Sequence, residues 1–237
     1  ADIEGDAAET VATEIGGTAK KIDVSDEAAM MRLVEEIETD IGPIDLFISN
    51  AGVAFGDAES GSISKEGGLN PIEDRWDISW KVNVMAQVYA ARAVIPKMLQ
   101  RGGGHIINLA SAAGLLSQIG DSAYSATKHA SVGFSESLAI NYGDDGIKVS
   151  VVGPQAGAAR LGGMEEDAGA REGGFGGNEV DGSLKAEEVA DIIVEQAREG
   201  RFMILTHPRV VDYIQRKSGD YDRWIGGMRK FRRSLTK

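Results

Sequence analysis

The stretch IDLFISNAG, residues 44–52, decides the fold class, because a short continuous apolar run ends here in a glycine turn. Such a run is typical of a strand that is buried on both faces of a parallel sheet. The stretch GGGHIINLAS (102–111) predicts another turn followed by a buried strand, and IKVSVVGP (147–154) predicts a strand that closes on proline. We therefore expect all three segments to be strands of one parallel sheet.

Helix-like segments separate these strands. Residues 5–15 predict a helix that ends at Gly16, and TAKKIDV (18–24) predicts a short strand with Asp23 and Val24 at its carboxyl end. Further helices are expected over residues 26–40, 72–99, 124–142 and 186–200, and a last strand over 201–207. This alternation, with crossovers long enough for parallel pairing, predicts a doubly wound α/β sheet flanked by helices.

The composition favours a single domain over residues 1–237, with 42% hydrophobic and 26% charged side chains. No apolar run approaches the roughly 18 residues of a membrane span, and the acidic first residues do not form a secretory signal. We expect a cytoplasmic protein that does not bind a membrane. The chain has no cysteine, which excludes disulfides and thiolate metal sites, and we expect no metal.

A net charge of -12 argues against nucleic-acid binding, which depends largely on neutralising phosphates. The carboxyl-terminal segment (207–237) is an exception, because it is basic against an acidic body. It predicts an amphipathic helical tail that is solvated or contacts another subunit, and a nucleic-acid patch is the alternative. Its basic residues are Arg216, Lys217, Arg223, Arg229, Lys230, Arg232 and Arg233, and its helix-spaced apolar residues are Trp224, Ile225, Met228 and Phe231.

Ligands of doubly wound sheets bind beyond the carboxyl ends of the strands. Residues that directly follow predicted strands should therefore line one cleft, and they are Asp23, Asn50, Ala51, Gly52, Ser111 and Pro154. Tyr124 and Lys128, in AYSATKHA, are four residues apart on a predicted helix and so lie on one face of it. This spacing alone is weak evidence for a functional pair, because an exposed tyrosine and lysine without a role could have the same spacing.

The combination is specific, and with it the chain resembles the short-chain dehydrogenase/reductase (SDR) family over nearly its whole length. The residues that carry the resemblance are Tyr124 and Lys128, Ser111 thirteen positions before the tyrosine, Asn50-Ala51-Gly52 after a strand, and Asn83 inside a long helix. The family has a Rossmann-type fold and transfers hydride between a nicotinamide cofactor and a secondary alcohol or ketone. The resemblance implies a homo-oligomer, a tetramer or a dimer.

The chemistry explains the catalytic residue types. Hydride transfer to or from a carbinol carbon requires a proton to move at the substrate oxygen. A phenol, with an ordinary pKa near 10, is a poor base, and a nearby ammonium lowers that pKa. Lys128 is thus a suitable partner for Tyr124. By resemblance, Lys128 also binds the nicotinamide ribose, Ser111 orients the substrate oxygen, and Asn83 holds a water of a proton relay.

The resemblance also implies the cofactor contacts. Asn50, Ala51 and Gly52 would approach the adenosine ribose, and Asp23 and Val24 the adenine ring, although Asp23 could instead cap a helix. Asp2 resembles the family carboxylate that binds the ribose 2′-hydroxyl, which favours NAD over NADP; a frayed terminus is the alternative. Pro154 and Gly157 would contact the nicotinamide side, while Gln155 and Ala159 replace the family's glycine and threonine. Losing the threonine hydroxyl would weaken binding by roughly 1 kcal/mol.

Two further segments bear on how the cofactor phosphates and the substrate would be bound. The family's first strand and glycine-rich phosphate turn should precede Asp2, and we expect an amino-terminal extension of the natural polypeptide to contain them. Residues 158–182 resemble the substrate lid in position only, and Leu115, Leu116 and Ile119 form either an apolar wall of the substrate site or ordinary packing. The leading hypothesis is a dehydrogenase for small or medium apolar secondary alcohols; the alternative is a related protein that binds a ligand or partner without turnover.

Overall fold

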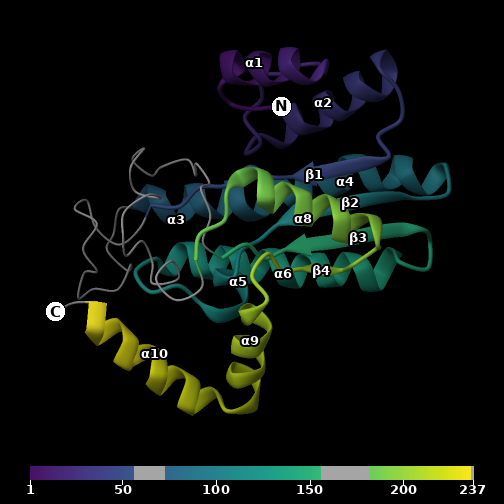
Figure 1. Cartoon of the computed structure of the whole chain (residues 1–237). Helices are drawn as coiled ribbons and strands as arrows, with labels where there is room; N and C mark the ends of the chain where they lie inside the picture. The colour runs from purple at the N-terminus through teal and green to yellow at the C-terminus, as the bar shows by residue number, and fades with distance from the viewer. Residues whose placement is uncertain (56–72, 156–181, 236–237) are drawn as a thin grey trace.

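Four parallel strands form one sheet in the order β1-β2-β3-β4 in the computed structural model of the chain, which describes residues 1–55, 73–155 and 182–235 (Figure 1). In this register Ser49 lies beside Asn108, and Leu109 beside Val152. The doubly wound α/β class and the three strands expected around residues 44–52, 102–111 and 147–154 are therefore confirmed. The strands are β1 (Leu46–Ser49), β2 (Gly104–Leu109), β3 (Ile147–Val152) and β4 (Met203–Ile204).

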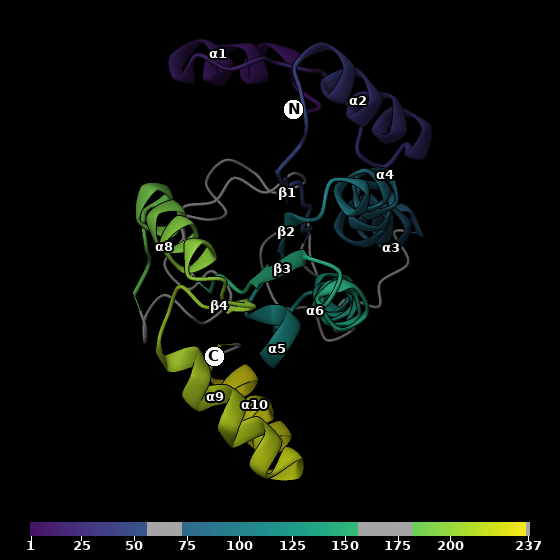
Figure 2. The same ribbon diagram turned by 90° about the vertical axis from the view of Figure 1, so that its right-hand side faces the viewer.

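Helices cover both faces of the sheet. Figure 2 shows α3, α4 and α6 on one face and α8 on the other. A π-helical turn, η1, joins α3 to α4, so residues 73–100 form one long helical segment as expected. The helices are α1 (Gly5–Ile15), α2 (Glu27–Asp40), α3 (Glu73–Trp80), η1 (Lys81–Met85), α4 (Ala86–Gln100), α5 (Ala113–Leu116), α6 (Ser122–Tyr142), α8 (Ala186–Arg198), α9 (Arg209–Gly219) and α10 (Tyr221–Leu235).

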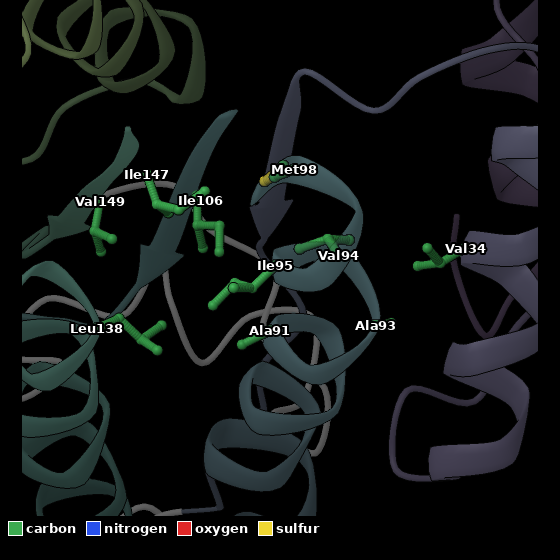
Figure 3. Close-up of a cluster of buried hydrophobic side chains, with 10 residues drawn as sticks. All are labelled: Val34, Ala91, Ala93, Val94, Ile95, Met98, Ile106, Leu138, Ile147 and Val149. Carbon is green, nitrogen blue, oxygen red and sulfur yellow. The ribbon is translucent and has the colours of Figure 1, made fainter. Parts of the chain in front are cut away.

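Adjacent residues of β2 face opposite sides of the sheet, and each side is buried. Ile106 packs with Val94 of α4 and Leu138 of α6 in the largest apolar cluster (Figure 3). Ile107 packs instead with Val152 and Ile204, against which α8 lies. This two-sided burial is why the adjacent residues Ile106 and Ile107 are both apolar.

Helix α2 packs against α4, and Val34 is its buried contact with the main cluster. Ion pairs such as Arg92–Glu27 and Lys97–Glu35, each 2.7 Å long, lie beside this contact. Their side chains are largely exposed, so apolar burial contributes more to the packing than these pairs do.

Three expectations about the strands are wrong. Residues 18–24 form no strand: Lys21 makes a single parallel bridge with Asp2, and no second described segment pairs with them. The first strand is not buried on both faces, because β1 is the outer strand of the described sheet and its Leu46 and Ile48 are each 48% exposed. The last strand is only Met203–Ile204, since it pairs with just two residues of β3.

The described helices include none that is long and apolar enough to cross a membrane. Gly157, Ala159 and all of the predicted lid except its last residue, Gly182, lie outside the described residues.

Gly114 allows α5 to approach α6 at backbone distance. A Cβ at this position would overlap the backbone carbonyl of Lys128, which a side-chain rotation cannot relieve. Gly133, on the exposed side of α6, has nothing within 4 Å of such a Cβ.

We expect Gly114→Ala to lower the free energy of unfolding by about 1–3 kcal/mol, because α5 and α6 must separate. In contrast, Gly133→Ala should raise it by up to about 1 kcal/mol, because alanine favours the helix. Urea denaturation followed by circular dichroism measures both. Equal stability of Gly114→Ala and the parent protein would contradict the close helix contact.

Candidate active site

The carboxyl ends of β1, β2 and β3 lie at one edge of the sheet, as the parallel register requires. Asn50, Ser111 and Pro154 follow these three ends. The Ser111 hydroxyl donates to the Pro154 carbonyl at 3.3 Å, and the Ala112 backbone N–H donates to the same carbonyl at 2.8 Å. The predicted cleft residues after β2 and β3 are thus in direct contact.

Helix α6 brings Tyr124 to this edge. Asp121 is its N-cap: one carboxylate oxygen accepts from the Tyr124 backbone N–H at 2.7 Å, and the other accepts from the Phe55 N–H at 3.2 Å. Tyr124 therefore lies in the first turn, where its side chain meets the end of β2 and lies close enough to the Ser111 side chain for a hydrogen-bonding interaction to affect the pKa of the phenol. The capping carboxylate ties this turn to the loop after β1.

Lys128 lies one turn further along and is almost completely buried, with 2% of its surface exposed. Its ammonium donates to the Leu109 carbonyl at 2.9 Å and lies 5.5 Å from the centroid of the Tyr124 ring. Burial, which disfavours a charge, lowers the pKa of Lys128 from 10.5 to about 8. Tyr124, Lys128 and Ser111 are therefore brought together, as the sequence predicts.

The pKa of Tyr124 is raised, against the expectation that Lys128 lowers it. Burial is the largest cause, the Ser111 hydrogen bond opposes it, and the charge of Asp121 adds to it. The phenolate would lose its hydration in this site, and the Lys128 ammonium does not point at the phenol oxygen but at the Leu109 carbonyl. In the ligand-free protein, Tyr124 is a phenol.

Asn83 lies in the π-helical turn and is completely buried. Its side-chain amide donates to the Val53 carbonyl at 2.9 Å and to the Thr127 hydroxyl at 3.1 Å, and its oxygen accepts from the Val53 N–H at 2.8 Å. The side chain thus joins the loop after β1 to α6. π-Helical turns are frequent at functional sites.

The predicted adenosine contacts are arranged in two groups. Asn50 to Gly52 directly follow β1, where the buried Ser49 hydroxyl has no hydrogen-bond partner among the described residues. Asp2 and Asp23 lie near each other through the bridge of Asp2 with Lys21. Each carboxylate accepts a local backbone N–H, from Glu4 and Ser25 respectively, and Asp26 rather than Asp23 caps α2.

Three residues of the site are not among those predicted from the sequence. Asp121 has a local signal in the sequence, because an aspartate just before a helix is a typical N-cap. Helix α6 begins at Ser122, two residues before the predicted start at residue 124. Thr127 bonds Asn83 and the Tyr124 carbonyl, and Gly114 allows the α5–α6 contact. Neither shows a pattern in the sequence, because both contacts join distant segments.

Fold and site together define a Rossmann-type α/β protein with a buried tyrosine–lysine pair at the carboxyl edge of its sheet. A family model described as short chain dehydrogenase matches residues 1–167. The chain belongs to the short-chain dehydrogenase/reductase family.

Individual relatives agree with this assignment. The chain is 31% identical over 214 residues to 1-deoxy-11-beta-hydroxypentalenate dehydrogenase of Streptomyces exfoliatus, covering 87% of this chain and 72% of that protein. It is 33% identical over 132 residues to nodulation protein G of Azospirillum brasilense, covering 56% of this chain and only 50% of that protein. The chain thus spans half the length of this second relative.

A solved structure shows the same fold. The short chain dehydrogenase/reductase of Burkholderia phymatum in complex with NAD matches with a TM-score of 0.74 and 26% identity, covering 93% of this chain and 83% of that chain.

We expect Asn83→Ala to lower the free energy of unfolding by about 1–3 kcal/mol, because it leaves the part-buried N–H and carbonyl of Val53 without their Asn83 partner. Asn141→Ala is the matched control: Asn141 bonds only its own helix, at an exposed site, and should change stability by less than about 0.5 kcal/mol. Chemical denaturation measures both variants. Equal effects would show that the Asn83 bonds do not hold the loop.

Proposed function

We propose that the protein is an NAD(H)-dependent oxidoreductase that interconverts a secondary alcohol and its ketone, with Tyr124 as the general acid and base. One observation carries the proposal: the buried Tyr124 phenol lies beside the Ser111 side chain and has the Lys128 ammonium beside its ring. A buried phenol, a hydroxyl and a cation at the carboxyl edge of a parallel sheet can bind one small polar group and move a proton at it.

The residues present fit a nicotinamide cofactor. An ammonium has three N–H donors, and Leu109 is the hydrogen-bond partner of Lys128 among the described residues, which leaves donors for the ribose hydroxyls. The unpaired buried hydroxyl of Ser49 and the small residues Ala51 and Gly52 suit the close approach of a second sugar. When bound, the cofactor supplies a carbon that accepts or donates hydride.

NAD, rather than NADP, is the proposed cofactor. The carboxylate of Asp2, beside the segment that contains Asp23, would accept a hydrogen bond from a ribose 2′-hydroxyl and repel a 2′-phosphate. The related Burkholderia phymatum structure, which holds NAD, supports this choice.

The proton steps follow from the protonation states. At pH 7 Tyr124 is a phenol and can donate its proton to the oxygen of a ketone, while Ser111 holds that oxygen. In the oxidising direction a phenolate must accept the alcohol proton. Because the pKa of Lys128 is about 8, its side chain is mostly charged at pH 7 and stabilises this phenolate. Asn83 would hold the water that carries the proton onward.

The substrate proposed is a small or medium apolar secondary alcohol or the matching ketone. Leu116 is buried and packs against Val210, with Leu115 beside it, so both residues contribute to ordinary packing. The apolar substrate therefore rests on the resemblance to the family and on the place of these residues between Ser111 and Tyr124 in the sequence. We also propose a homo-oligomer, which the exposed Trp76 and Trp80 of α3 support.

We expect Tyr124→Phe to lower kcat/KM by about 10²–10⁴-fold, because the variant keeps the ring but cannot transfer a proton. Tyr142→Phe, at the other end of α6, should retain parent activity. Absorbance at 340 nm, followed with NAD or NADP and a panel of secondary alcohols, measures the effect.

Full activity in Tyr124→Phe would overturn the proposed mechanism. No turnover by the parent protein with any alcohol or ketone of the panel, together with measurable NAD binding, would favour a binding protein without turnover. A higher kcat/KM with NADP than with NAD would contradict the role of Asp2.

A further inference from the structure

Helix α9, in the carboxyl-terminal segment, brings the side chain of Lys217 to the candidate active site. Lys217 is partly buried and donates from its ammonium to the Leu115 carbonyl of α5 at 2.6 Å. The same ammonium lies 3.3 Å from Nε2 of His129, the residue after Lys128 on α6. One cation of the tail therefore contacts both segments that carry site residues.

The hydrogen bonds of His129 agree with this geometry. Its Nδ1 lies 2.8 Å from the Ser125 carbonyl, which can only accept, so Nδ1 carries the hydrogen. In a neutral imidazole the other ring nitrogen is then an acceptor, and Nε2 can take a hydrogen from the Lys217 ammonium. The Ser125 carbonyl, His129 and Lys217 thus form one chain from α6 to α9.

Helix α5 depends on partners outside itself. It is a single turn, Ala113–Leu116, and a helix of this length is not stable alone. Lys217 binds a carbonyl of this turn, and apolar contacts of Val210 with Ala112 and Leu116 hold it from the same helix α9. A cation at the carboxyl end of a helix is also favoured by the helix dipole.

The position of α5 determines that of Ser111. The Ala113 N–H donates to the Ser111 hydroxyl at 3.1 Å, and this hydroxyl donates to Pro154. If α5 shifts, the donor that orients the serine shifts with it. A contact in the tail can therefore affect the hydroxyl that meets Tyr124.

We propose that Lys217 is a positioning residue for the reaction, which clamps α5 and α6 together and so holds Ser111 against Tyr124. This inference rests on the proposed function. It assigns the basic tail a role inside the subunit: one of its cations is used to brace the site.

Hydrogen exchange tests the clamp without any turnover. Lys217→Met keeps the side-chain length but removes the ammonium. We expect amides of residues 113–117 to exchange at least about tenfold faster in this variant. Amides of β3 (147–152) should be unchanged, which shows that the fold is intact. Lys230→Met, an exposed lysine of α10, is the matched control and should change neither region.

Kinetics test the link to Ser111. In Lys217→Met we expect kcat to fall about tenfold at an unchanged KM for NAD, because Ser111 is misplaced while the β1 edge is intact. The primary isotope effect on kcat with a C-deuterated alcohol should rise, because the chemical step becomes slower. Lys217→Arg, which retains a donor, should recover part of the loss, and His129→Gln should show a smaller loss than Lys217→Met.

The outcomes distinguish a failure of the Lys217 proposal from a failure of the proposed oxidoreductase function. Unchanged exchange at residues 113–117 in Lys217→Met overturns the clamp. Faster exchange there, with an isotope effect and kcat equal to those of the parent, shows a clamp that does not position Ser111 and also overturns the proposal. If Tyr124→Phe keeps full activity, the proposed function fails, and the exchange result still reports on the clamp.

Discussion

The burial of the Lys128 ammonium is the constraint on which the rest of the site depends. A buried charge is costly unless it is paired or hydrogen-bonded. Here the compensation comes from the Leu109 carbonyl at the end of β2 and from the face of the Tyr124 ring. Both partners must be held at fixed positions, so the sheet edge, the start of α6 and the approach of α5 at Gly114 are coupled to one side chain.

Two buried polar residues, Asp121 and Asn83, hold the site in place from the loop after β1. Asp121 joins the first turn of α6 to the loop after β1, and Asn83 joins the same loop to Thr127 on α6. Their bonds go to backbone groups that would otherwise be buried without partners, so they stabilise the site as well as shape it. The chemistry at Tyr124 thus uses a framework in which few groups can move independently.

The sequence predicts those features that depend on local patterns. Adjacent apolar residues, Ile106 and Ile107 in β2 and Val151 and Val152 in β3, identify these strands because both of their faces are buried, and helical spacing places Tyr124 and Lys128 on one face. Features that depend on distant partners are either not predicted from the sequence or predicted wrongly. The exposed face of β1 depends on what packs beside it, and the raised pKa of Tyr124 depends on burial that no spacing reveals. Lys217 resembles any other cation of the basic tail until α9 is placed against α5.

The charge state of Lys128 is the most direct test of this account. Its pKa can be measured by NMR titration of the side chain in ligand-free protein labelled at lysine, with the resonance assigned by comparison with Lys128→Arg. The account predicts a pKa of about 8, so that the side chain is mostly charged at pH 7 and neutral by pH 10. A pKa near the ordinary 10.5 of lysine would contradict it, because the ammonium would then not be desolvated by its surroundings.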